Sequence, residues 1–520
     1  MKDMKDIEMI DIDDDYDNVN VSHKKVKSKK TPLTGDQKFG LFVSYLYLVL
    51  SIVFIGSLKI ADLLPIYLIA LVIVGLSLLY LYTYFTQFGS KTMRRTGTFL
   101  SILLCICLAF GTYYILVTKG TLNKISGANT KTDSISLIVM DQDPAKTVED
   151  LNGYTFGIAT AIDRENSDHA LSDTGNTLGY AVDYKECGVI DQLVDSLYNG
   201  DVDVIVLNEA YRQTIEESRV NFSTETRVII TYKYEKELED ANSVDVVSEP
   251  FIVYISGNDT YGEIAETSRS DVNILAVVNP KTKNILLLST PRDSYVELSI
   301  APGSRDKLTH AGIYGIDCSM DTLEMLYDID INYFIRVNFT GFQNIIDALG
   351  GVTVENDVSF VSHDGYTFEQ GTLELDGLHA LHFSRERKAF AMGDIQRGIN
   401  QMKVMKAMIK KATSPAILNN YSSLMAGVSD SFLTSMDDKE ISALVKMQLK
   451  KNTDWNTVSY NVSGTTSSEY TYSVSSTPLS VVILDQSTID SAKTLINKVL
   501  NGESITQQEA DSMTKNDSLH

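Results

Sequence analysis

Arginine is unevenly distributed along the chain, and this distribution is the first sign of chemistry. Seven of the 13 arginines lie between residues 269 and 397, about a quarter of the 520 residues. Lysine is the common solubilising cation, whereas the planar guanidinium of arginine can bind two phosphate oxygens at once. The clustering therefore predicts a local anion site. The seven are Arg269, Arg292, Arg305, Arg336, Arg385, Arg387 and Arg397.

Carboxylates accompany these arginines near the ends of predicted strands. Asp259 and Asp271 flank the start of one strand, Arg292-Asp293 follows another, and Asp394-Ile395-Gln396-Arg397 precedes a helix that carries Gln401. Such carboxylates can be ordinary ion-pair partners. They can also bind Mg²⁺, which takes one or two carboxylates and completes its shell with water and phosphate oxygens.

Other kinds of active site find little support in the sequence. His310, His363, His379 and His382 form no HExxH motif, and the pair 379–382 flanks a predicted strand. The sequence has no G-x-S-x-G elbow, P-loop or G-x-G-x-x-G motif. Its four cysteines include no CxxC pair, so neither a zinc ribbon nor a disulfide scaffold is indicated.

The elements that must hold the arginines follow an α/β pattern. Apolar runs predict strands, and amphipathic runs between them predict helices. Thr340 is the predicted N-cap of one helix, which Gly350-Gly351 ends. The predicted strands are 251–256, 273–278, 284–289, 333–338 and 481–484, and the predicted helices are 317–327, 340–349 and 399–409.

A smaller α/β domain is expected ahead of this region, over residues 118–245. Strands at 134–139, 154–159 and 202–207 alternate with a helix at 190–198. The pattern is similar to a lobe of a solute-binding protein, and it contains no catalytic cluster. A structural or partner-binding module and a solute receptor both remain open for this accessory domain.

The first 120 residues indicate a membrane anchor. Three apolar runs, 39–58, 63–85 and 97–117, each have the length that a helix needs to cross a bilayer. Lysines cluster before the first run, and Lys91, Arg94 and Arg95 separate the second from the third. The positive-inside rule then predicts a cytoplasmic tail at 1–38 and an extracytoplasmic location for everything after about residue 118.

Several motifs, in order, resemble the LytR–CpsA–Psr family over residues 251–415. The three apolar runs and the accessory domain resemble its CpsA-type capsule proteins of streptococci and relatives. This resemblance implies an α/β/α sandwich with an apolar groove for a lipid tail. From the sequence we also expect a C-terminal part at 416–502 that packs on this domain and a loose polar tail at 503–520. The motifs are Ser268-Arg269-Ser270-Asp271, Ser289-Thr290-Pro291-Arg292-Asp293, Gly350-Gly351-Val352, Leu375-Asp376-Gly377, Ser384-Arg385-Glu386-Arg387 and Asp394-Ile395-Gln396-Arg397.

The resemblance also implies a function and a set of site residues. The family transfers a glycopolymer, here capsular polysaccharide or a related wall polymer, from a polyprenyl pyrophosphate carrier to peptidoglycan. Asp259 and Asp271 would bind Mg²⁺, with Mn²⁺ as the alternative cation. Asp271, Arg292 and Asp293 would be catalytic, with either aspartate as the general base. The residues expected to bind pyrophosphate are Arg269, Arg292, Arg385, Arg387, Arg397, Gln396 and Gln401.

A second hypothesis from the sequence is a non-enzymatic membrane regulator of capsule biosynthesis that senses a polyprenyl-phosphate ligand. Both hypotheses place the protein at the membrane and admit contacts with capsule-synthesis proteins. The chain has 45 basic and 68 acidic side chains, a net charge of −23. This balance argues against nucleic acid as a partner, because phosphate backbones require an excess of lysine and arginine.

Overall fold

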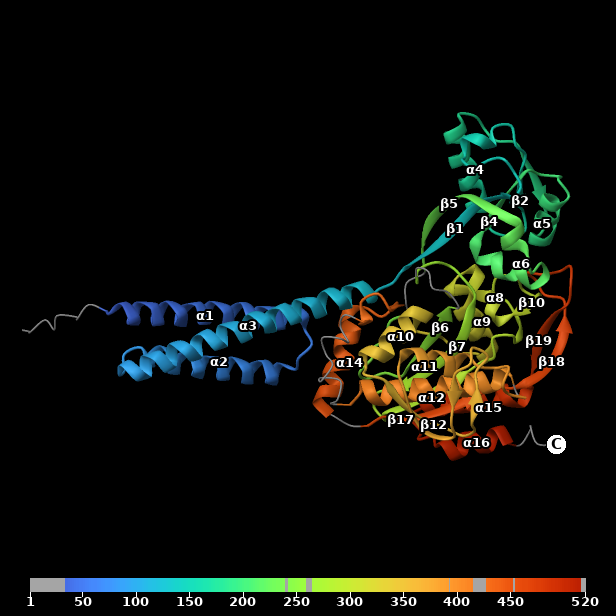
Figure 1. The fold of residues 1–520 in the computed structure, drawn as a ribbon. Coiled ribbons are helices and arrows are strands. Elements are labelled where there is room, and N and C mark those ends of the chain that lie inside the picture. The colour runs from blue at the N-terminus through green and yellow to red at the C-terminus, as the bar shows by residue number, and fades with distance from the viewer. Residues whose placement is uncertain are drawn as a thin grey trace, which may run out of the picture. The chain divides into compact units, whose positions relative to one another are not determined.

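Figure 1 shows the computed structural model of the chain. Two compact units make up its described part, one of residues 33–49 and 77–105 and the other of residues 50–76 and 106–515. The structure describes residues 33–238, 242–258, 264–391, 393–414, 427–451 and 454–515.

Three long helices confirm the three apolar runs near the N-terminus. They are α1 (Gly35–Ala61), α2 (Ile66–Thr86) and α3 (Lys91–Ile125), and each is long and apolar enough to cross a membrane. Large apolar side chains such as Phe42 and Phe99 are exposed on them. Exposed apolar side chains are what a helix presents when its solvent is lipid.

The accessory domain is built on a five-stranded sheet in the order β3-β2-β4-β1-β5. Strand β2 pairs in parallel with β3 and β4, whereas β1 runs antiparallel to β4 and β5. One face packs on α4 and the other on α5 (Figure 1). The bounds are β1 (Thr130–Met140), β2 (Phe156–Ala159), α4 (Arg164–Leu178), β3 (Tyr184–Cys187), α5 (Ile190–Tyr198), β4 (Val204–Asn208), α6 (Arg212–Ser218), α7 (Phe222–Glu225) and β5 (Thr226–Glu237).

A six-stranded sheet in the order β16-β11-β6-β7-β8-β17 forms the second domain. Strands β6, β8, β11 and β17 run in one direction, and β7 and β16 run against them. The bounds are β6 (Phe251–Asn258), β7 (Ser270–Asn279), β8 (Asn284–Ser289), β11 (Tyr333–Asn338), β16 (Phe432–Thr434) and β17 (Asn456–Asn461).

Helices cover both faces of this sheet, which confirms the α/β/α sandwich. Successive side chains of a strand point to opposite faces. Thus Tyr254 and Leu275 pack with α9 and α15, while Val253 and Ile274 pack with α12 and α14. Because both faces are buried, the strands are apolar at nearly every position. The helices are α9 (Ile316–Tyr327), α12 (Asp394–Ala412), α14 (Asp438–Lys451) and α15 (Gln486–Leu500).

Shorter elements surround the sandwich. Phe360, Phe368 and Phe383 form a separate aromatic core beneath α10 and α12. The elements are β9 (Tyr295–Glu297), β10 (Arg305–Lys307), α8 (Leu308–Ala311), the 3₁₀ helix η3 (Gly312–Tyr314), α10 (Phe339–Ala348), β12 (Val352–Asn356), β13 (Phe360–Val361), β14 (Thr367–Phe368), β15 (Gly371–Leu375), α11 (Gly377–Arg385), β18 (Gly464–Glu469), β19 (Leu479–Leu484) and α16 (Gln507–Lys515).

Helix α10 ends where the sequence predicts but begins earlier. Gly350 and Gly351 adopt positive φ after it, as a helix-ending glycine pair can. The predicted N-cap at Thr340 is wrong, because the side chain of Asn338 accepts a hydrogen bond from the Gly341 amide at 2.8 Å. Asparagine and threonine are both good N-caps, so residue type alone does not choose between two candidates this close in sequence.

Two other local expectations also differ from the structure. His379 and His382, expected to flank a strand, lie within helix α11. The polar tail, expected to be loose, contains α16, in which Ala510 is buried and Gln507 hydrogen-bonds to the backbone of Ser459. Pairing between a polar side chain and a distant strand leaves no trace in composition. Strands β16 and β17 lie after residue 415, so the segment 416–502 completes the main sheet as well as packing on it.

Candidate active site

A cavity of about 310 Å³ opens at one edge of the main sheet. This edge carries the ends of β6, β8 and β11 and the start of β7, since β7 runs against the other three. The N-terminal ends of α10 and α12 and the C-terminal end of α11 contribute further walls. The carboxyl ends of strands in α/β sheets are where ligands commonly bind.

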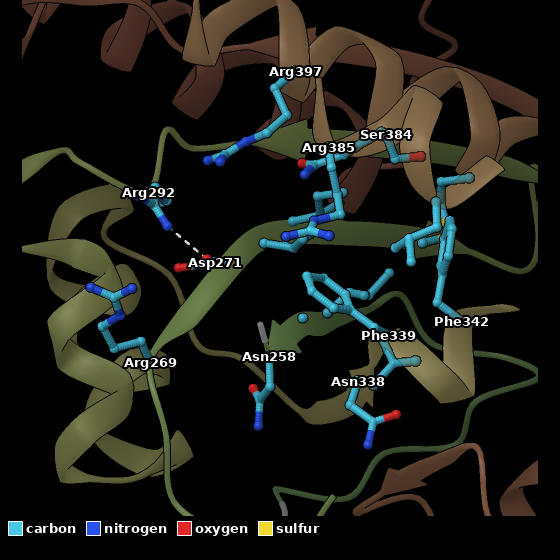
Figure 2. Close-up of a pocket in the computed structure, with 18 of the residues that line it drawn as sticks. Asn258, Arg269, Asp271, Arg292, Asn338, Phe339, Phe342, Ser384, Arg385 and Arg397 are labelled. Carbon is cyan, nitrogen blue, oxygen red and sulfur yellow. Dashed lines mark hydrogen bonds and ion pairs between the residues drawn. The ribbon is translucent and has the colours of Figure 1, made fainter. Parts of the chain in front are cut away.

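Five of the seven clustered arginines line this cavity. Figure 2 labels Arg269, Arg292, Arg385 and Arg397. Arg269 comes directly before β7, Arg292 follows β8, and Arg397 lies in the first turn of α12. Arg385 and Arg387 reach the cavity from the end of α11 and the loop after it, and both are exposed. Segments spread over residues 269–397 therefore place five guanidinium groups around one cavity.

Asp271 is the carboxylate at the centre of this group. It is 8 % exposed, and it accepts hydrogen bonds from Arg292 Nη1 at 2.6 Å and from Thr309 Oγ1 at 2.9 Å. Burial by itself would raise its pKa, but the positive charges of Arg292, Arg269 and Arg397 outweigh burial and hold the pKa well below its usual range. Asp271 is therefore ionised at neutral pH, and its main partner is Arg292.

Two of the five arginines that line the cavity have hydrogen-bond donors without acceptors among the described residues. The Nε–H groups of Arg269 and Arg292 are buried, and neither has a hydrogen-bond partner among the described residues. A buried unsatisfied donor costs free energy, more so when it is charged. For Arg292, the Asp293 carboxylate lies 3.6 Å from Nε, too far for a hydrogen bond but close enough to attract its charge.

Arg397 is held in place by a carboxylate of its own helix. Asp394 forms an ion pair with Arg397 one turn along α12. Burial raises the pKa of Asp394, although the positive charge of Arg397 opposes this shift. Burial lowers the pKa of the Arg397 guanidinium, although the negative charge of Asp394 opposes that shift. Arginine nevertheless stays protonated in proteins, so this pair fixes a permanent positive charge at the cavity wall.

The other part of the cavity is apolar. Figure 2 shows Arg269, Asp271 and Arg292 toward one side of the view and Phe339 and Phe342 toward the other. Arg385 lies over the ring of Phe339, with its guanidinium carbon 4.1 Å from the ring centroid. The apolar lining is Ile255, Val272, Ile274, Val337, Phe339, Phe342, Leu381 and Met405.

This lining shows which helix borders the apolar part of the cavity. Helix α10 borders the cavity through Phe339 and Phe342. Helix α9, which corresponds to the predicted helix at 317–327, instead packs into the core on one face of the sheet. A single space thus has a strongly cationic end and an apolar end.

Not every residue predicted for the site reaches the cavity. Gln401 lines it, but Gln396 does not and donates instead to Asn400 Oδ1 at 3.1 Å. Asp293 does not line the cavity either, and its carboxylate lies 3.6 Å from Arg292 Nε and 3.8 Å from Lys307 Nζ. Asp259 lies outside the described residues. The roles assigned to Gln396, Asp293 and Asp259 therefore stay predictions.

The structure adds residues that the sequence did not suggest. Thr309 binds Asp271, and Asn258 and Asn338 stand at the ends of β6 and β11 beside the cavity. Lys307 and Glu217 extend the charged network beyond it. None of these belongs to the arginine-rich motifs. Only the position of Asn258 and Asn338 at strand ends could have drawn attention to them.

A metal ion at this site would have few protein ligands. Among the described residues, no group of three histidine, cysteine, aspartate or glutamate side chains could hold one. Asp271 is the only carboxylate among the described residues that line the cavity, and Asn258 offers an amide oxygen at the same cavity. Such a sparse, all-oxygen set fits Mg²⁺ bound jointly with an anion, because Mg²⁺ keeps waters and phosphate oxygens as ligands.

Comparison with protein families and curated proteins gives a consistent result. A model of the LytR_cpsA_psr family matches residues 218–487, which include all five arginines of the cavity. The polyisoprenyl-teichoic acid–peptidoglycan teichoic acid transferase TagU of Bacillus cereus is 37 % identical over 195 residues, which are 37 % of this chain and 63 % of that protein. TagU of Enterococcus faecalis is 39 % identical over 200 residues, 38 % of this chain and 65 % of that protein. The chain thus spans less than two thirds of these relatives' length.

Solved structures resemble about half of the chain. The crystal structure of TagV from Bacillus subtilis is 24 % identical, covers 50 % of this chain and 99 % of that chain, and has a TM-score of 0.41. Protein gbs0355 from Streptococcus agalactiae is 25 % identical, covers 54 % of this chain and 100 % of that chain, and has a TM-score of 0.43.

Proposed function

The chain belongs to the LytR–CpsA–Psr family, and we propose that it is a membrane-anchored transferase. In this proposal it moves a glycopolymer from a polyprenyl pyrophosphate carrier to peptidoglycan. The names of the TagU proteins describe the same kind of reaction for teichoic acid. For this chain we propose capsular polysaccharide or a related wall polymer as the cargo, and capsule-synthesis proteins as partners.

One observation supports the proposal above all others. The cavity joins five guanidinium groups, two with unsatisfied buried Nε–H donors, to an apolar pocket around Phe339 and Phe342. A polyprenyl pyrophosphate has the matching shape, with a densely charged head and an apolar tail. Binding pockets are typically apolar with a few placed polar groups that fix orientation. A small soluble phosphate would leave the apolar part of the cavity unexplained.

The arginines account for how the reaction would be accelerated. The acceptor hydroxyl can attack the phosphorus, which releases polyprenyl phosphate, or the sugar carbon, which releases polyprenyl pyrophosphate. In either case negative charge accumulates on the departing phosphate oxygens. Preorganised cations aimed at this charge stabilise the transition state, and they act strongly in a site shielded from water. Arg269, Arg292 and Arg397 are buried or nearly so and are held by carboxylates, so their positions are fixed before substrate binds.

Asp271 is better suited to orient groups than to accept a proton. Its pKa lies well below the usual range, and both carboxylate oxygens already accept hydrogen bonds. An efficient general base has a pKa near the working pH. We therefore assign Asp271 to holding Arg292 and, together with Asp259, to binding Mg²⁺ or Mn²⁺. The metal would supply Lewis-acid stabilisation of the pyrophosphate oxygens.

The membrane anchor fits the nature of the substrate. Helices α1, α2 and α3 would keep the protein at the bilayer that also holds the lipid carrier. The distribution of Lys91, Arg94, Arg95 and the N-terminal lysines supports a cytoplasmic N-terminus. An odd number of spans then places the catalytic domain outside the cytoplasm, where peptidoglycan is found.

The proposed function is tested by comparing arginines inside and outside the cavity. We expect Arg292→Ala and Asp271→Asn to lower the amount of wall-linked polymer by at least about 100-fold, because each removes part of the charge stabilisation. Arg305→Ala is the matched control, since Arg305 is an exposed arginine of the same domain that does not line the cavity.

The measurement is wall-linked polymer in cells that depend on the variant, with the amount of folded protein in membranes determined in parallel. Wild-type attachment by Arg292→Ala at normal protein levels would contradict the transferase. Such a result, combined with altered capsule expression, would instead favour a regulator.

A further inference from the structure

The accessory domain contributes one side chain to the charged network of the catalytic domain. Glu217, near the C-terminal end of α6, accepts a hydrogen bond from Arg269 Nη1 at 2.5 Å and another from Lys307 Nζ at 2.9 Å. As a whole residue Glu217 is exposed, but its side chain is only 24 % exposed, against 10 % for Arg269 and 7 % for Lys307. Both carboxylate oxygens are therefore used to bridge two nearly buried cations.

Glu217 holds Arg269 from outside the cavity. Arg269 lines the cavity, whereas Glu217 and Lys307 do not. The bond to Glu217 uses Nη1 of Arg269 and leaves its buried Nε–H without an acceptor among the described residues. A carboxylate in this place fixes the plane of the guanidinium and does not occupy the face that an incoming anion would need.

Lys307 carries the same network to Arg292 and Asp271. Its ammonium lies 3.8 Å from Asp293, whose carboxylate is 3.6 Å from Arg292 Nε. Lys307 directly precedes α8, in which the Thr309 side chain binds Asp271 and the Thr309 amide donates to the Arg292 carbonyl at 2.8 Å. A change at Glu217 would thus affect Arg269 directly, and Arg292 and Asp271 through Lys307.

The contact is held by packing and by charge. Ile313 of η3, just after α8, is part of the apolar core of the accessory domain, and the rings of Tyr211 and Tyr314 pack at 6.0 Å. Burial would raise the pKa of Glu217, but the charges of Lys307, His310 and Arg269 hold it below its usual value. Glu217 is therefore ionised at neutral pH and sits on a firmly docked element.

We propose that Glu217 is a positioning residue through which the accessory domain orients Arg269 and Lys307 beside the pyrophosphate cavity. The inference rests on the proposed function and deepens it, because it gives the accessory domain a part in the transfer reaction. Glu217 lies one residue before the segment that the family model matches. Glu217 belongs to α6 of the accessory domain, whose later elements α7 and β5 lie within the matched segment.

The test uses the full chain in detergent and compares three variants. Glu217→Gln removes the charge at nearly constant shape, and Glu217→Asp keeps the charge on a shorter side chain. Glu216→Gln is the matched control on the same helix, where the Glu216 carboxylate accepts from Ser223 Oγ. The probes are farnesyl pyrophosphate and farnesol, whose dissociation constants are measured beside kcat and KM of polymer transfer.

If Glu217 orients Arg269 and Lys307, its replacement should weaken binding of the pyrophosphate group and leave binding of the farnesyl chain unchanged. Glu217→Gln should weaken farnesyl pyrophosphate binding and lower kcat/KM about tenfold, roughly the effect of losing one charge-assisted hydrogen bond. In Glu217→Gln, farnesol binding and the unfolding temperature should stay close to wild type. Glu217→Asp should bind farnesyl pyrophosphate with an affinity between those of wild type and Glu217→Gln. Glu216→Gln should match wild type.

Other results would overturn the inference. Equal behaviour of Glu217→Gln and Glu216→Gln would show that Glu217 has no role at the site, and equal loss of both probes would show a merely structural one. Tighter pyrophosphate binding by Glu217→Gln would show that Glu217 competes with the substrate. Absence of farnesyl pyrophosphate binding in the wild type would contradict the proposed function itself, which separates the two failures.

Discussion

The accessory and catalytic domains both place polar side chains at the carboxyl ends of their strands, yet the two groups differ in how they are satisfied. In the accessory domain, Asp163 follows β2 and accepts hydrogen bonds from Asn166 and Asn208, both at 2.7 Å. In the catalytic domain, Arg269 and Arg292 have buried donors with no acceptor among the described residues. The first group is complete without a ligand, and the second is not.

The cavities of the two domains show the same contrast. The accessory domain has a cavity of about 590 Å³, larger than the one of about 310 Å³ beside the arginines. Among the described residues, its lining includes Asp168, Asn176 and Tyr180 but no arginine or lysine. Volume alone is thus a poor guide to the reaction site. Convergent charge with unsatisfied hydrogen bonds is the better criterion.

The largest expected effect comes from changing an arginine to lysine in each domain. Arg397→Lys keeps the charge but loses the planar fork, so we expect transfer to fall about 100-fold. Arg164→Lys makes the same change in the accessory domain, where Arg164 binds Asp168 and Glu186 near the surface, and it should alter transfer less than twofold. The measurement is the transfer rate of Arg397→Lys and of Arg164→Lys, each relative to wild type. Equal losses would erase the distinction between the two domains.

Acidity should affect the two domains in opposite directions. Burial raises the pKa of Asp163 from 3.8 to about 6, so the folded accessory domain binds this proton more tightly than the unfolded chain does. Its stability should therefore rise as the pH falls from 6 toward 4, by up to roughly 3 kcal/mol. The pKa of Asp271 is lowered, so its contribution is complete above about pH 4 and is lost only below that value.

Hydrogen–deuterium exchange at pH 7 and pH 5, corrected for intrinsic rates, measures this difference. Peptides from β2 and β4 should be better protected at pH 5, while peptides from β7 and β8 should be unchanged. Equal responses in both domains would contradict the environments assigned to Asp163 and Asp271.

The smallest expected effect concerns the accessory cavity. Asn176→Ala removes an amide from its wall without touching the cavity of the arginines. Because surface substitutions away from functional groups usually change little, we expect transfer within twofold of wild type. Steady-state transfer rates provide the check. A loss of tenfold or more would mean that the accessory cavity takes part in the reaction and that a solute receptor should be reconsidered.

The sequence anticipates much of the fold because its strands are apolar runs bounded by polar turns. The run at 284–289 is strand β8 as predicted, and 333–338 is β11. The five cavity arginines are also visible in the sequence, since their residue type and clustering are unusual. Roles at Asp259 and Asp293 remain predictions, because the first lies outside the described residues and the second does not line the cavity.

Tertiary pairing is what the sequence does not reveal. Thr309 binds Asp271 from 38 positions away, and Glu217 binds Arg269 from another domain. A threonine on a short helix or a glutamate near a helix end has many possible roles, and neither stands in a motif. Only the packing of α8 against β7 and of α6 against the catalytic domain selects these partners. The sequence could therefore predict the cations of the site but not the groups that hold them.

The most direct test of the central claim is a crystal structure of the chain with farnesyl pyrophosphate bound. The phosphate oxygens should lie at about 2.7–3.2 Å from guanidinium nitrogens of Arg269 and Arg292, as hydrogen bonds require. The farnesyl chain should then run along Phe339 and Phe342. A pyrophosphate bound in the accessory domain, or one that contacts the guanidinium of neither Arg269 nor Arg292, would contradict the account.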